Sequence, residues 1–351
     1  MRWRTTLGVV VMMLCGSAAA YLAGGHYYTL WALHAIAQQK QLIKGSDDYW
    51  SLEALCAEIP DVSREFDAIT QRQRVLWSLD MREVGTWGWM GACYSPISKH
   101  MAASQYYIHG LTGAPKSSVR RAAADLIARL APQDRADLSD QDKANWACAR
   151  GFALHLYGDS FAHSEFGEGA DGLLYPTGMG HLREYSQPDY MAASQHDPGD
   201  RWTDWTLGLS QALYGSPDAG IALNALVAKE APGLVPQGKN EDPKVAESTG
   251  VENLLKTVGP PPYPGIVLDI ANVEKDVVHM VDTDCQGELN KAAGNGVSAP
   301  GRLKPDCAKV WAIYLSQARE AFRAQGVTMR GHGGPQPDCD DPGDVLQWGS
   351  Q

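Results

Sequence analysis

The sequence predicts an all-α protein with one large core. Two observations favour this class: apolar residues recur at helical spacing through most of residues 26–190, and no segment shows the sustained apolar–polar alternation of a half-buried strand. The chain has 351 residues, of which 44% are hydrophobic and 20% charged, so it can bury a sizeable core. We therefore expect one large helical domain, with or without an appended subdomain.

The first helices are expected at residues 26–42, 52–59 and 63–79. Pro60 separates the second from the third, because proline lacks the backbone N–H that a helix interior requires. Residues 98–111 form a further candidate, which ends where two glycines follow closely.

The middle of the chain carries the clearest helical signals. Residues 117–130 follow Pro115 and are rich in Ala and Arg, both of which favour helix. Ser139 is a suitable N-cap for a helix that continues to about residue 166. The glycine-rich residues 167–180 that come next predict a loop.

The chain changes character after Pro188. Residues 197–265 are rich in proline and glycine, with short helices expected at 202–214 and 221–229. Helices are expected again at residues 271–282 and 305–325, and the Gly/Pro/Asp-rich residues from 330 onward predict a flexible tail.

The N-terminus has the pattern of a Sec-type secretory signal peptide. Arg2 and Arg4 precede the apolar residues 7–14, and residues 17–20 are small enough for cleavage. We therefore expect a secreted or periplasmic protein. Removal of the signal leaves six cysteines, an even number that allows up to three disulfides in an exported chain, with the pairing open; free buried thiols are the alternative in a reducing compartment. These are Cys56, Cys93, Cys148, Cys285, Cys307 and Cys339.

The overall charge bears on the class of partner. Thirty Lys and Arg against 41 Asp and Glu give a formal net charge of −11. Stable binding of duplex nucleic acid normally requires a basic face, so we do not expect it here.

A run of three side chains carries the main chemical signal. His155, Asp159 and His163 are each four residues apart, so on a helix they lie on one face over two turns. Imidazole nitrogens and carboxylate oxygens are ligands that zinc favours. The run therefore predicts a metal site.

These residues carry a family resemblance. His155 and Asp159 with His163 close behind, then His181 after the glycine loop with an acid nearby, resemble the zinc-dependent phospholipase C family. The same superfamily includes zinc-dependent single-strand nucleases of fungi and plants. Asp61, which follows Pro60, resembles an aspartate ligand of bacterial relatives. The matching segments span residues 24–190.

The resemblance implies an all-α bundle that holds two or three zinc ions, with Asp159 bridging two of them. One ion would be held by four residues, Asp61, His109, His155 and Asp159, and His26 would help to hold the second. The third site would use His163, His181 and an acid that is either Glu184 or Asp189. Three features differ from the family: the step from Asp159 to His163 is short, Glu184 follows His181 by three residues where the family's acid follows by four, and the predicted mature N-terminus lies five residues before His26.

Together the motif and the resemblance predict a zinc-dependent phosphodiester hydrolase that cleaves phospholipids by a metal-activated water. Asp61 is the candidate to orient that water or act as general base, with Asp159 the second catalytic residue. A phospholipid or other phosphodiester substrate implies peripheral contact with a membrane. The alternatives are a single-strand nuclease and, in another class, a non-catalytic metal-binding or toxin-like interaction module.

We accordingly expect five regions along the chain: a signal peptide at 1–20, a helical metal-binding core at 21–195, an irregular insertion or cap at 196–265, C-terminal helices that complete the same domain at 266–329, and a flexible tail at 330–351.

Overall fold

The computed structural model describes residues 25–43, 49–67, 96–132, 136–164, 172–175, 201–230, 253–254, 256–259, 284–292, 304–328, 330–331 and 334–335. These parts are mostly helical, as predicted. The helices are α2 (Gly25–Gln39), α3 (Trp50–Val62), α6 (Pro96–Tyr107), α7 (Lys116–Arg129), α8 (Asp140–Ala162), α9 (Arg201–Tyr214), α10 (Asp218–Glu230), α12 (Cys285–Ala292) and α13 (Cys307–Ala324). Two strands of two residues each, β1 (Arg330–Gly331) and β2 (Gly334–Pro335), pair antiparallel.

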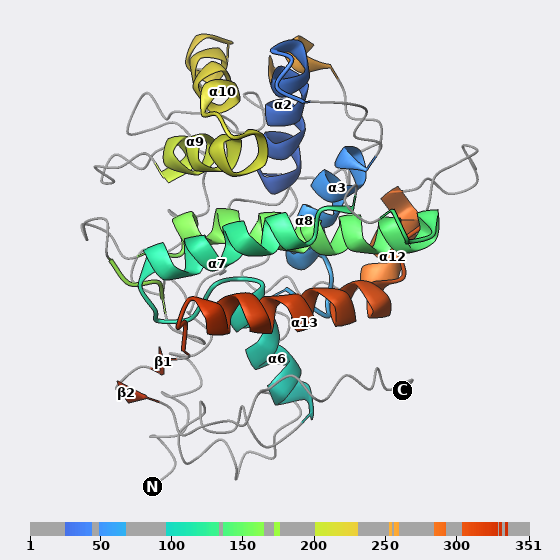
Figure 1. Cartoon of the computed structure of the whole chain (residues 1–351), viewed down its shortest axis with the longest axis vertical. Helices are drawn as coiled ribbons and strands as arrows, with labels where there is room; N and C mark the ends of the chain where they lie inside the picture. Colours follow the sequence, from blue (N-terminus) through green and yellow to red (C-terminus); the bar gives the residue numbers. More distant parts are fainter. Residues whose placement is uncertain are drawn as a thin grey trace, which may run out of the picture.

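Helix α8 lies at the centre of the fold. Helices α7 and α13 pack against it and against each other, α3 packs on it more extensively than any other helix, and α2, α9 and α10 group together at one end of the molecule (Figure 1). Every residue from 147 to 162 is buried, which is the pattern of a helix enclosed by others on all sides. The side chains that α8 presents are therefore held inside the protein.

The start of α8 is fixed by a local signal that the sequence predicts. The Ser139 hydroxyl accepts a hydrogen bond from the backbone N–H of Asp142 at 3.1 Å, so Ser139 is the N-cap as expected. Asp140 and Asp142 in the first turn interact favourably with the positive end of the helix dipole.

Helices α3 and α8 approach each other closely at Gly151. A Cβ atom at this position would lie 2.5 Å from the carbonyl oxygen of Glu53 and 2.6 Å from the Cβ of Cys56, so only glycine fits. The disulfide Cys56–Cys148 joins the same two helices. Beside it, the Arg150 guanidinium donates to both carboxylate oxygens of Glu53 at 3.0 Å, which pairs two charges that are otherwise costly to bury.

The predicted break at Pro60 is wrong. Helix α3 continues through Pro60 to Val62, and Ser63 to Asp67 form a turn where a second helix was expected to begin. All residues from 52 to 62 are buried, so tertiary packing maintains the helix despite the backbone donor that proline lacks.

Two other predicted helices end early. The helix that begins near residue 98 stops at Tyr107, because the chain turns at Gly110 with a left-handed φ of 63°. Helix α8 stops at Ala162 instead of residue 166, and the Arg201 side chain donates to the carbonyls of Ala162 and Ser164. The predicted helix at 271–282 lies outside the described residues.

Residues 201–230 belong to the same hydrophobic core as the rest of the fold. Helices α9 and α10 agree closely with the two short helices expected here. Both pack against α2, and α9 also packs against α8. Trp205, Leu209 and Leu223 are fully buried in that core.

A second disulfide, Cys285–Cys307, joins the starts of α12 and α13. Two disulfides are compatible with the expected extracellular or periplasmic location. Cys93, Cys339 and the expected signal peptide lie outside the described residues. None of the helices that the structure describes has the length and apolar character of a membrane-spanning segment.

Replacing Gly151 with Ala tests the close approach of α3 and α8. Helix propensity alone favours alanine by about 1 kcal/mol, whereas the added methyl group would overlap the backbone of α3 and cost about 1–3 kcal/mol. We expect net destabilisation in urea unfolding. An increase in the free energy of unfolding would contradict the packing described here.

Candidate metal centre

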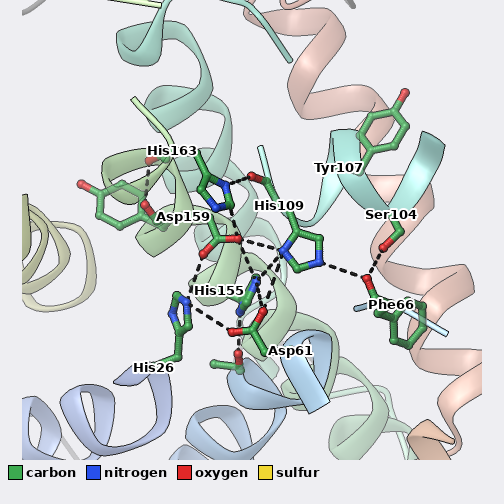
Figure 2. Close-up of polar contacts among 12 residues, drawn as sticks. His26, Asp61, Phe66, Ser104, Tyr107, His109, His155, Asp159 and His163 are labelled. Carbon is green, nitrogen blue, oxygen red and sulfur yellow. Dashed lines mark hydrogen bonds and ion pairs between the residues drawn. The ribbon is translucent and has the colours of Figure 1, made fainter. Parts of the chain in front are cut away.

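Five of the predicted metal-ligating side chains converge on one buried point (Figure 2). His26 comes from the first turn of α2, Asp61 from the last turn of α3, and His155 and Asp159 from α8. His109 lies in the turn that follows α6. Four segments that are distant in sequence thus supply one cluster of nitrogen and carboxylate ligands.

The two carboxylate oxygens of Asp159 face different histidines. Oδ1 lies 3.1 Å from Nε2 of His26. Oδ2 lies 3.0 Å from Nδ1 of His109 and 3.0 Å from Nε2 of His155. Asp159 therefore lies within 3.1 Å of all three histidines, with one oxygen towards His26 and the other towards His109 and His155.

The carboxylate of Asp61 lies slightly further from the three histidines than that of Asp159 does. Its Oδ1 is 3.7 Å from Nε2 of His155 and 3.9 Å from Nδ1 of His109, and its Oδ2 is 4.0 Å from Nε2 of His26. Two groups in the described part of the chain have the donor spacing to hold a metal ion: His26, His155 and Asp159, and Asp61, His109 and His155.

Backbone carbonyls orient two of the imidazoles. His155 donates from Nδ1 to the carbonyl of Ala57 at 2.8 Å, and His109 donates from Nε2 to the carbonyl of Phe66 at 3.0 Å. A carbonyl can only accept, so each outer nitrogen carries the proton and, in a neutral ring, the inner nitrogen carries the lone pair. This outer-nitrogen contact is typical of metal-ligating histidines.

The inner nitrogens of His109 and His155 are only 3.2 Å apart. Two lone pairs cannot face each other at this distance, beside a carboxylate, without a positive charge between them. That charge is either a proton or a metal ion. The donor set of the cluster could therefore hold a metal ion.

In the metal-free cluster, the pKa values of the two histidines favour protonation of His109 over His155. The pKa of His155 is lowered to about 4, because burial, together with the charges of His26 and His109, outweighs the attraction of Asp159. Burial also lowers the pKa of His109, but its hydrogen bond to Asp159 and the charge of that group outweigh it, so the net direction is upward. The pKa of Asp159 lies well below its ordinary value, because the neighbouring histidines outweigh its burial.

His163 adjoins the cluster but belongs to neither ligand group. Its Nδ1 donates to the backbone carbonyl of His109 at 2.7 Å and lies 3.8 Å from Oδ2 of Asp159. The partners expected for it in a third metal site, His181 with Glu184 or Asp189, lie outside the described residues. The predicted third site therefore stays a prediction.

The structure adds residues that sequence reasoning missed. The carbonyls of Ala57 and Phe66 orient the ligands, and a carbonyl leaves no signal in the sequence because every residue has one. Gly158 is different: a Cβ here would lie 2.6 Å from Cε1 of His26. A glycine inside a helix, directly before a candidate ligand, could have indicated this close approach.

The protonation of the cluster can be tested by ¹⁵N-histidine NMR on the metal-free protein. We expect His155 to stay in the neutral Nδ1–H form from pH 7 down to about pH 5, because its pKa is lowered to about 4. His109, whose pKa is raised, should keep both ring protons to higher pH than an exposed histidine. A His155 that is protonated at pH 6, or that carries its proton on Nε2, would contradict the arrangement.

Comparisons of the chain with protein-family models, with curated proteins and with solved structures returned no match. The interpretation of the cluster therefore depends on its own geometry.

Proposed function

We propose that the chain is a zinc-dependent phosphodiester hydrolase that cleaves phospholipids in the manner of a phospholipase C. One observation carries the proposal: the two oxygens of Asp159 face two different sets of histidines in a fully buried cluster. A carboxylate in this arrangement can bridge two closely spaced metal ions, which is the form of site that catalyses in-line phosphoryl displacement.

The donor spacing supports zinc for the first position. Zn–N and Zn–O bonds of about 2.0–2.1 Å in a tetrahedron place the donors about 3.3 Å apart. The inner nitrogens of His109 and His155 lie 3.2 Å from each other and 3.0 to 3.9 Å from Oδ2 of Asp159 and Oδ1 of Asp61. Two imidazoles and two carboxylates also form the mixed N/O donor set that zinc accepts.

The second position would use the other oxygen of Asp159. His26 presents Nε2 to Oδ1 at 3.1 Å, on the side away from His109. Oδ2 of Asp61 is 4.0 Å from the same nitrogen. With Asp159 shared, the side chains support two zinc ions, the lower of the two numbers expected from the sequence.

The side chains around the cluster support a water nucleophile. Bound zinc lowers the pKa of a water towards 7 and stabilises the charge that develops on the phosphoryl oxygens. Asp61 lies within 4.0 Å of all three histidines, and in this proposal it would accept the proton of that water. The nearby hydroxyls of Ser160 and Ser164 donate to backbone carbonyls one turn earlier, so neither is activated as a nucleophile.

Asp159→Asn tests the proposal, because it keeps the shape of the side chain and removes its charge. We expect the variant to lose at least one zinc ion by elemental analysis. Phospholipid hydrolysis should fall by more than the ~10–100-fold that outer contacts of a metal site typically contribute. Asp125→Asn, at a half-exposed acid that pairs with Arg129 on α7, is the matched control and should leave both properties unchanged.

Two results would overturn the proposal. Purified wild-type protein without bound zinc, and without affinity for it, would remove the metal centre. Zinc binding with no hydrolysis of any phosphodiester, and only a lower melting temperature in Asp159→Asn, would favour the non-catalytic metal-binding module.

The substrate class is tested by comparing turnover of phosphatidylcholine vesicles with turnover of single-stranded DNA. The formal net charge of −11 gives little attraction for a polyanion, so we expect kcat/KM to favour the phospholipid. Faster cleavage of single-stranded DNA, abolished by chelation, would instead identify a nuclease.

A further inference from the structure

The contacts that hold His26 come from several helices. Its ring lies against that of His155 in a tilted arrangement, with a centroid distance of 4.2 Å, and makes an edge-on contact with the ring of Trp205 at 5.3 Å. Trp205 belongs to α9 and is fully buried. The imidazole of His26 thus contacts two rings, one from α8 and one from α9.

The backbone of Gly158 also lies against the imidazole of His26 and, with the rings of His155 and Trp205, encloses it. A Cβ at Gly158 would approach Cε1 of His26 to 2.6 Å, its Nδ1 to 2.9 Å and Cε2 of Trp205 to 3.1 Å. The backbone of α8, the imidazole and the indole are therefore packed together without space for one more carbon atom. In this enclosure Nε2 of His26 points at Asp159.

Helix α9 is itself anchored to the two helices that supply the ligands. Arg201 donates to the carbonyls of Ala162 and Ser164 at the end of α8, at 2.7 and 2.8 Å. The indole N–H of Trp202 donates to the hydroxyl of Thr29 on α2 at 3.2 Å. These contacts fix the indole of Trp205 relative to both His26 and Asp159.

We propose that Trp205 is a positioning residue for the second metal position. This inference rests on the proposed metal centre and deepens it: residues 201–230 complete the site at His26, whereas α3, α8 and the turn after α6 form the first position without them. A ligand held rigidly in its bound orientation loses little freedom on binding, so removal of the indole weakens binding through His26 selectively.

Stepwise zinc titration of metal-free protein against a chromophoric chelator tests the inference. Wild type should bind two equivalents. In Trp205→Leu, the affinity for the second zinc equivalent should fall about 10-fold or more, which is the range for outer contacts of a metal site. Trp205→Phe should show a smaller loss. In both variants the affinity for the first equivalent should be unchanged. His26→Ala gives the reference for complete loss of the second equivalent.

Two further variants separate positioning from general destabilisation. Leu209→Ala removes a fully buried side chain from the same helix and leaves the contacts of Arg201, Trp202 and Trp205 in place, so it should lower the melting temperature and leave both zinc affinities unchanged. Gly158→Ala should reproduce the selective loss, because its methyl group would overlap the imidazole of His26 and crowd the indole of Trp205. This variant keeps the test decisive if Trp205→Leu does not fold.

The outcomes distinguish this inference from the proposed function. Wild type that binds no zinc overturns the metal centre as a whole. Wild type that binds one equivalent, or variants at Trp205 and Gly158 that weaken both equivalents or neither, leave the metal centre in place and overturn the positioning role.

Discussion

The close approach of α3 and α8 at Gly151 is the contact on which the rest of the structure depends. Where the two backbones touch, the Cys56–Cys148 disulfide and the buried Glu53–Arg150 pair secure them on either side. One turn further along α3, the carbonyl of Ala57 orients His155, and one turn beyond that Asp61 faces the same ring. The spacing between these helices therefore sets the spacing between the ligands.

The buried charges of the cluster favour a cation at its centre. Asp61 and Asp159 place two carboxylates in the interior, where an uncompensated charge is expensive. Because backbone carbonyls bind the outer nitrogens of His109 and His155, the surrounding rings offer lone pairs towards the centre. A divalent ion would balance the charges of both carboxylates and accept these lone pairs at the same time. A single proton carries one charge and can be shared by only two atoms.

Sequence alone predicts the helical class and the core of the site, for identifiable reasons. The four-residue steps between His155, Asp159 and His163 are a helical period, and Ser139 is a strong N-cap, so α8 and its ligand row can be predicted locally. The prediction that the helix ends at Pro60 is wrong, because the packing of α3 outweighs the tendency of proline to interrupt a helix. The carbonyl contacts and the enclosure formed by Gly158 and Trp205 depend on tertiary contacts, which no local pattern encodes.

The sequence separation of the ligands has a thermodynamic consequence. His26 and Asp159 are 133 residues apart, and His109 and Asp159 are 50 apart. No partly folded segment of the chain contains a complete ligand set, so a metal ion that binds this cluster binds the folded protein and scarcely the unfolded one. Its binding free energy is then added to the stability of the whole fold, not to that of a single loop. The fraction of protein with metal bound and the fraction of folded protein would then be linked, so that a change in one changes the other.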